Sequence, residues 1–98
     1  MNRNIDDTYY RLDAEEVKKA AEAARAIDIN ETLDMVYDAL KEKGYDPIPQ
    51  IIGYLLTEDP IYITSYKKAR TLICRHDRFE MMAEILKRYY NVDNTKNM

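Results

Sequence analysis

The residues that break helices are confined to one short part of this chain. Its two glycines are Gly44 and Gly53, and its three prolines, at positions 47, 49 and 60, lie in the same stretch. Glycine and proline disfavour the interior of a helix more than any other residue, so the long segments on either side of residues 44–60 are free to be helical. Sheets also need many turns, which these two residues commonly supply. The distribution therefore predicts an all-α fold.

Length and composition indicate one small domain. The chain has 98 residues, 46% of them hydrophobic and 34% charged, which suits a modest core. The first residues lack the apolar segment of a signal peptide, and the longest apolar run, residues 51–56, is far too short to span a bilayer. We therefore expect a cytoplasmic protein without membrane insertion. The single cysteine and the absence of any zinc-type spacing predict no metal and no cofactor.

Capping residues and apolar spacing predict a compact bundle of about five short helices within residues 13–90. Asp13 and Asn30 are suitable N-caps for the first two helices, and Gly44 is a typical stop for the second. Asp46-Pro47 is a cap followed by proline at the first position of the third helix, Asp59-Pro60 starts a short turn, and Asp77 is a cap for the last helix. We expect residues 1–12 to form a flexible regulatory tail and residues 91–98 a frayed end. The predicted helices are 14–26, 30–43, about 47–57, from Thr64 or Ser65 to near His76, and 78–90.

Two apolar patterns indicate where the core lies. The third predicted helix is apolar nearly all round, so we expect it to be buried against several neighbours at the centre of the core. Gly53 in that helix costs about 1 kcal/mol of helix propensity relative to alanine, which suggests a close contact there. The last helix carries a stripe expected to face inward, formed by Met82, Ile85, Leu86 and Tyr89.

Five short motifs in a fixed order suggest a family. They are Val36-Tyr37-Asp38-Ala39-Leu40, Lys43-Gly44-Tyr45, residues 50–56 (QIIGYLL), Asp59-Pro60 and Ala69-Arg70. From Thr32 to Tyr90 the chain resembles the IreB family of small regulatory phosphoproteins. The resemblance implies a helical, non-enzymatic, cytoplasmic regulator from Gram-positive bacteria. It also implies phosphorylation by a membrane-spanning Ser/Thr kinase that monitors the cell envelope, reversal by its phosphatase, and an unknown downstream protein.

The resemblance also suggests a phosphorylation site. The phosphoacceptor of the family is a threonine in the N-terminal segment, in a context similar to Asp-Glu-Thr-Val-Arg-Phe. The matching region here is residues 6–11 (DDTYYR), so Thr8 is the candidate. The segment between Thr8 and Thr32 is longer and richer in alanine than the family pattern leads us to expect.

The basic side chains suggest what the phosphate could bind. Acidic residues outnumber basic ones in residues 1–46, whereas basic residues are in excess afterwards. Since a phosphate adds about −1.5 to −2 charges, we expect Arg70, Arg75 or Arg78 to receive it, from the same chain or from a partner in a homodimer. A homodimer is expected because short helices in so small a chain leave apolar surface uncovered.

Two other functions were weighed against the regulatory one. A nucleic-acid-binding protein could use the basic side chains of residues 66–88, but the net charge of −3 counts against it. An enzyme is not expected, because no motif for a nucleophile, phosphate loop or metal is present. His76 beside Asp77 lacks a nucleophile. Cys74 could be activated by Arg70 and Arg78 on a continuous helix, but a packed or idle thiol is the commoner role.

Overall fold

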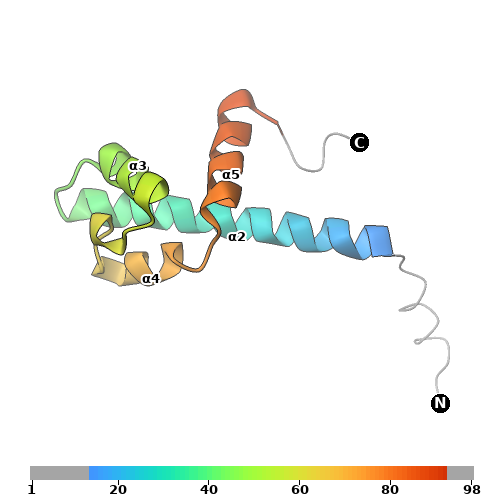
Figure 1. Ribbon diagram of the computed structural model, residues 1–98, viewed down its shortest axis with the longest axis horizontal. Helices are drawn as coiled ribbons and strands as arrows, with labels where there is room; N and C mark the ends of the chain where they lie inside the picture. Colours follow the sequence, from blue (N-terminus) through green and yellow to red (C-terminus); the bar gives the residue numbers. More distant parts are fainter. Residues whose placement is uncertain (1–13, 93–98) are drawn as a thin grey trace, which may run out of the picture.

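The computed structural model describes residues 14–92, and every regular element in this range is a helix (Figure 1). The prediction of an all-α fold is confirmed. Residues 1–13 and 93–98 lie outside the described part of the chain, so the predicted tail 1–12, the predicted cap Asp13 and most of the predicted tail 91–98 are not described. In chain order the elements are α2 (Ala14–Glu42), α3 (Pro47–Thr57), the 3-10 helices η1 (Pro60–Tyr62) and η2 (Tyr66–Lys68), α4 (Ala69–Ile73) and α5 (Arg78–Tyr90).

One long helix stands where two short helices were expected. α2 has 29 residues, about 43 Å at a rise of about 1.5 Å per residue. Asn30 does not cap a second helix, because its side-chain Nδ2 donates to the Ala26 carbonyl oxygen at 2.8 Å and to the Glu84 carboxylate at 3.1 Å. No glycine or proline lies inside α2 to interrupt it. The predicted break was wrong: the backbone stays helical through Asn30, and its side-chain Oδ1 makes no capping hydrogen bond.

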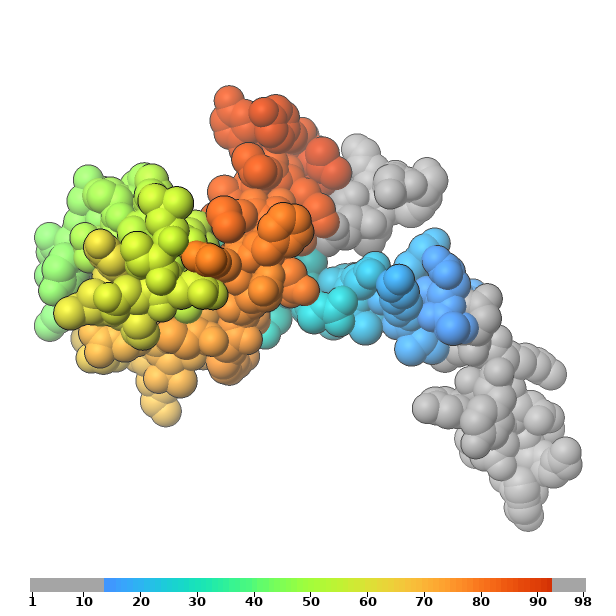
Figure 2. Space-filling model, viewed as in Figure 1, coloured from blue at the N-terminus to red at the C-terminus, as the bar shows by residue number. Residues whose placement is uncertain are grey.

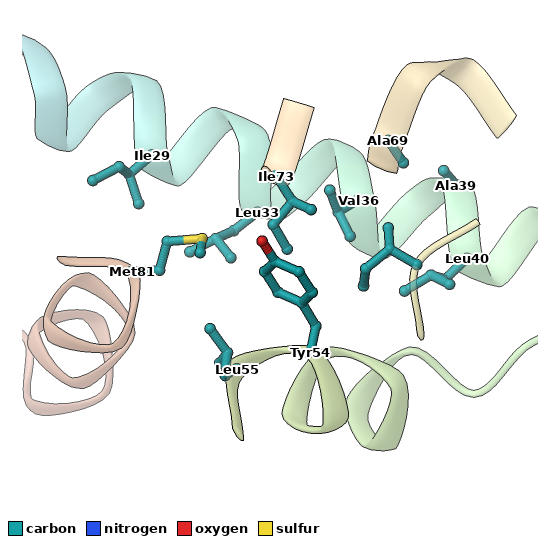
Figure 3. Close-up of a cluster of buried hydrophobic side chains, with 11 residues drawn as sticks. Ile29, Leu33, Val36, Ala39, Leu40, Tyr54, Leu55, Ala69, Ile73 and Met81 are labelled. Carbon is teal, nitrogen blue, oxygen red and sulfur yellow. The ribbon is translucent and has the colours of Figure 1, made fainter. Parts of the chain in front are cut away.

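The core lies where the C-terminal half of α2 meets the other helices. Figure 3 shows Tyr54 pointing from α3 toward α2, into the cluster that also receives side chains from α4 and α5. Burial of apolar surface stabilises such a cluster by about 25 cal/mol per Å² removed from water. The largest side chains that are fully buried are Leu40, Ile63, Ile73, Met81 and Val36.

The N-terminal part of α2 projects from this body as an arm, residues 14–25 (Figures 1 and 2). Every residue of the arm is exposed except Ala23, which is half-buried. Its apolar side consists mainly of alanines, so it offers little surface for packing. α2 is long enough to cross a bilayer but carries too many charges, and none of the described helices combines the length and apolarity that a membrane span requires.

α3 has the predicted bounds but only one buried face. Tyr54 and Leu55 face the core, whereas Ile48, Ile52 and Leu56 are exposed, Leu56 to 72%. The expectation that α3 is buried all round was therefore wrong. A short helix that lies against α2 on one side keeps its other side free, because the described residues place no further layer there.

α5 also has the predicted bounds, but the wrong stripe was assigned to the core. Asp77 is its N-cap, and its carboxylate accepts from the Glu80 backbone N–H at 3.0 Å, as the spacing suggested. Met81 and Glu84 are the buried residues of the helix. Met82 is only partly buried, and Ile85, Leu86 and Tyr89 are exposed. The side of α5 that faces the core is thus not the predicted one. The Glu84 carboxylate can lie on the inward side because it contacts Asn30 of α2 and Lys87.

Two features prevent the connection between α3 and α5 from forming one continuous helix, a cap at Asp59 and two lysines with left-handed backbone. Asp59 caps η1 by accepting from the Ile61 N–H at 3.0 Å, which agrees with the predicted turn at Asp59-Pro60. Lys67 and Lys68 both have positive φ angles, 54° and 62°. This left-handed backbone is unfavourable for side-chain-bearing residues, and it delays the start of α4 until Ala69. The predicted fourth helix is therefore shorter at both ends, and it stops at Ile73.

Gly53 marks a close approach between α3 and η1. A Cβ atom at this position would lie 2.6 Å from both Cδ1 and Cε1 of Tyr62. The Gln50 side chain of α3 donates to the Tyr62 carbonyl oxygen at 2.9 Å and holds the two segments together. The predicted close contact at Gly53 is thus confirmed, with the ring of Tyr62 as the neighbour.

Candidate functional site

The most extensive candidate site is an exposed apolar surface on α3 and α5. On α3, Ile48, Ile52 and Leu56 recur every four residues and so share one side of the helix. On α5, Phe79, Leu86 and Tyr90 follow one another at intervals of seven and four residues and form a second stripe along one side. The α3–α5 surface consists of Ile48, Ile52, Leu56, Phe79, Leu86 and Tyr90, all of them exposed.

Arg78 joins the two helices. As the first residue of α5, it donates through Nη1 to the carbonyl oxygens of Leu55 and Leu56, each 3.1 Å away. Phe79, the next residue of α5, is 73% exposed. Figure 2 shows α3 and the first turns of α5 side by side on one face. Exposed apolar patches of this kind commonly mark sites of protein contact.

The three arginines proposed to receive a phosphate do not form one cluster. Arg70 donates through Nε to the Ile63 carbonyl oxygen at 2.8 Å, which holds the connector below the core. Arg78 binds the C-terminal end of α3, and its Nε lies 3.6 Å from the Glu58 carboxylate. Both guanidinium groups thus serve the fold. Arg75 differs, because its charged partner lies on the long helix.

Arg75 belongs to a polar cluster between α2 and the α4–α5 turn, which we call the Asp28 cluster (Asp28, Thr32, Arg75 and His76). The Arg75 Nη2 and the His76 Nε2 lie 3.4 Å and 3.6 Å from the same atom, Oδ2 of Asp28. His76 Nε2 is also 3.1 Å from the Thr32 hydroxyl, which is buried. Asp28 and Arg75 are about half-exposed, so the cluster is open to solvent on one side.

Sequence reasoning considered His76 only with its neighbour Asp77 and therefore missed this cluster. Asp77 is occupied in capping α5. The partners of His76 lie more than forty residues earlier in the chain. The only sequence signal for the cluster was the spacing of Asp28 and Thr32, which are four residues apart and therefore share one side of a helix.

Cys74 is exposed at the end of α4 and contacts the one tyrosine that reaches the core from α3. The Tyr54 hydroxyl donates to the Cys74 Sγ at 3.6 Å. Burial, reinforced by this hydrogen bond, raises the pKa of Tyr54 to about 12. Cys74 is thus not a packed thiol, and its role as an idle one stays a prediction. The helix break after Ile73 removes the continuous helix on which Arg70 and Arg78 would have flanked the sulfur.

The described helices coincide with the region that a known protein family shares. The model of a family described as IreB regulatory phosphoprotein matches residues 14–91, which is well over half of the chain. The chain belongs to the IreB family. The match begins with the arm of α2 and ends one residue after α5, so all the described helices of this IreB-family protein lie within it.

The matched region of this IreB-family protein also contains a groove between α2 and α5. The groove has a volume of about 680 Å³ and is lined by Ala23, Ala26, Ile27, Asn30, Glu31, Asp34, Glu84, Lys87, Arg88, Asn91 and Val92. Glu84 is nearly buried at its base, 3.4 Å from the Lys87 Nζ, and Arg88 pairs with Asp34 at 3.2 Å. These contacts join the middle of α2 to the end of α5.

The site residue inferred from the family resemblance, Thr8, lies outside the described residues and outside the matched region. The body that would receive a phosphate is described in full. Within residues 14–92, no group of three or more His, Cys, Asp or Glu side chains is arranged to hold a metal ion.

Proposed function

We propose that this chain is a non-enzymatic cytoplasmic regulator that is phosphorylated on Thr8 by a membrane-spanning Ser/Thr kinase and acts through protein contacts in envelope-stress signalling. The observation that carries the proposal is the match to the IreB regulatory phosphoprotein family over residues 14–91. Thr8 has an acidic pair before it and lies near the start of the chain, a context that suits access by a kinase. A phosphatase would reverse the modification.

The α3–α5 surface supports action through protein contacts, and we propose a second copy of the chain as its first occupant. Its exposed side chains come from two helices that are fixed to one another by Arg78. A twofold dimer pairs a surface with itself, which suits a patch of aliphatic and aromatic side chains whose members need no charged complement. The downstream protein could then bind the arm, the groove or the remaining faces.

The contacts of the basic residues argue against the nucleic-acid alternative. Lys67 pairs with Glu42, Arg75 with Asp28 and Arg88 with Asp34. Nucleic-acid binding needs several cations free to face phosphates along one groove or strand. Here five of the seven cations of residues 66–88 lie beside an acidic side chain: Lys67, Arg75, Arg78, Lys87 and Arg88.

The decisive experiment is phosphosite mapping on protein isolated from its own host under envelope stress. We expect phosphate on Thr8 in cells with the kinase, loss of the phosphate in kinase-deficient cells, and its accumulation without the phosphatase. Thr8→Ala serves as the blocked form, and Thr71→Ala, at an exposed position on α4, is the matched control. An unmodified Thr8 in cells where the kinase phosphorylates other substrates would refute this part of the proposal.

A separate experiment tests the nucleic-acid alternative. The binding of fluorescent single-stranded and double-stranded DNA and RNA is measured at two salt concentrations, because binding through phosphates weakens steeply as salt rises. We expect no binding at either concentration. Salt-sensitive binding that is lost when Arg75 and Arg88 are replaced by glutamine would favour the alternative.

A further inference from the structure

The groove between α2 and α5 has one wall on the long helix and the other on α5 and the turn that follows it. The α2 residues of the wall recur at intervals of three and four, which is the spacing of a stripe that packs against another helix. They are Ala23, Ala26, Ile27, Asn30, Glu31 and Asp34. The first and last are eleven residues apart, about 16 Å or three helical turns. Figure 1 shows α5 standing across α2, with the arm continuing beyond it.

The mouth of the groove is apolar. Ile27 on α2 is 61% exposed, and Val92 after α5 is 52% exposed. Val92 is held at the groove by the end of α5, where Asn91 has a φ of 61° and the Val92 N–H donates to the Lys87 carbonyl oxygen at 2.8 Å. Ala23 on the α2 wall is small, and small side chains let two helices approach closely. An apolar helix face could therefore cover this mouth.

The inner part of the groove is rich in hydrogen-bond acceptors. Glu84 is only 8% exposed, and its two carboxylate oxygens lie 3.1 Å from the Asn30 Nδ2 and 3.4 Å from the Lys87 Nζ. The Asn30 Oδ1 is buried and accepts no hydrogen bond from the described residues. A buried acceptor without a donor is unfavourable. This wall of the groove thus lacks a donor.

The charges that line the groove do not balance. Three acidic residues, Glu31, Asp34 and Glu84, stand against the two basic residues Lys87 and Arg88. Lys87 lies beside Glu84, and Arg88 pairs with Asp34 at 3.2 Å. The exposed side chain of Glu31 forms no ion pair or hydrogen bond with any residue in the range 14–92. The charge that the groove lacks is therefore a cation.

We propose that this groove docks a basic amphipathic helix of a partner protein. The helix lies along α2, with apolar side chains on Ile27 and Val92 and a lysine or arginine beside Glu31 and Asn30. The inference rests on the proposed function in one respect, since it takes the chain to act through protein contacts. It names the kind of partner for a surface that is separate from the α3–α5 surface.

A helix suits the groove better than a small free cation. Both walls are helical and present side chains at intervals of three and four, so a third helix can place its ridges between their rows. A small cation such as a polyamine would neutralise Glu31 but would leave Ile27 and Val92 in contact with water. The apolar mouth and the acidic interior are both satisfied only by a helix that combines the two kinds of side chain.

The test measures the binding of a designed peptide to the full chain. The probe is an alanine-based helical peptide of about 15 residues with a leucine and two lysines on one side, and its counterpart carries glutamates in place of the lysines. Affinity comes from fluorescence anisotropy, and the contacted residues come from ¹H–¹⁵N spectra. We expect the lysine peptide to shift the signals of the lining residues and to bind about tenfold more tightly than the glutamate peptide, because two charges are reversed.

Two substitutions in the groove have matched controls on the same helix. Ile27→Gln should weaken binding of the lysine peptide about tenfold by removing apolar contact, and Glu31→Gln should weaken it about threefold by removing one exposed charge pair. Val17→Gln and Glu22→Gln remove an apolar side chain and a carboxylate at exposed positions of α2 outside the groove, and they should leave the affinity unchanged. All four positions are exposed, so each variant should fold.

Several results would overturn the proposal. They are the absence of binding by the lysine peptide, equal binding of the two peptides, and equal losses in the groove variants and their controls. Spermidine that binds as tightly as the lysine peptide would assign the groove to polyamines, and self-association that Ile27→Gln abolishes would assign it to a second copy of the chain.

The outcome is distinct from that of the proposed function. Repeating the titrations with Leu56→Lys excludes a contribution from the α3–α5 surface, to which Leu56 belongs. The peptides require no kinase and no modified residue. A failure of the groove proposal therefore leaves the phosphorylation of Thr8 open to its own test, and an unmodified Thr8 does not affect the binding measured here.

Discussion

Replacing Gly53 by alanine tests the close contact between α3 and η1, because two opposing effects act at this position. Alanine in a helix interior is favoured over glycine by about 1 kcal/mol. The new Cβ atom would lie 2.6 Å from two ring atoms of Tyr62, however, so the ring or the helix must move. Overpacking of this kind costs about 1–3 kcal/mol. We therefore expect Gly53→Ala to lower the free energy of unfolding by about 1 kcal/mol.

A double-mutant cycle with Tyr62→Ala separates the two effects. Without the ring, the same Gly53→Ala change should stabilise the protein by about 1 kcal/mol, through helix propensity alone. Urea denaturation followed by far-UV circular dichroism gives all four free energies. Gly44→Ala is the control: its φ of 88° is strained for alanine, but no atom lies within 4 Å of the added Cβ, so its cost should not depend on Tyr62. A stabilising Gly53→Ala in the otherwise natural chain would refute the reasoning.

Three further predictions concern the surface, the core and a cap. Leu56→Lys should abolish the proposed dimer in sedimentation experiments and change monomer stability by less than about 0.5 kcal/mol, because Leu56 is largely exposed, whereas Val17→Lys on the arm should leave the dimer intact. Since the folded pKa of Tyr54 is about 12 against an ordinary value of 10.0, its neutral form contributes stability below pH 10 that is lost as the pH rises toward 12. Thermal denaturation across this range should show that loss, and Tyr54→Phe should reduce it; an equal loss in both proteins would contradict the assignment. Asp77→Ala should cost about 1 kcal/mol by removing the cap of α5, and a cost near zero in urea denaturation would show that the cap is dispensable.

The local sequence predicted the features that depend on neighbouring residues. The starts of α3 and α5 follow from Asp46-Pro47 and Asp77, because a cap or a proline acts on its own first turn. The turn at Asp59-Pro60 follows for the same reason. The family resemblance, which depends on the order of short motifs, also came from the sequence and is confirmed by the family match.

Features that depend on distant residues could not be predicted in this way. Asn30 lies inside α2 and donates to Glu84, fifty-four residues later, a contact that no local pattern reveals. α3 has apolar residues on several sides, so its pattern does not specify which side faces α2. The inward side of α5 was misassigned because a buried glutamate stands where periodicity predicts an apolar residue.

The candidate sites divide in the same manner. The sequence by itself determined that the chain is helical, where α3 and α5 begin, and that the basic residues Arg70, Arg75 and Arg78 follow the apolar block. Only the tertiary structure decided that Arg70 and Arg78 bind backbone carbonyls while Arg75 meets Asp28 and His76. The physical reason is that caps and helix propensities act within a few residues. The partner of a long charged side chain, in contrast, is selected by whichever helix the packing of the core brings beside it.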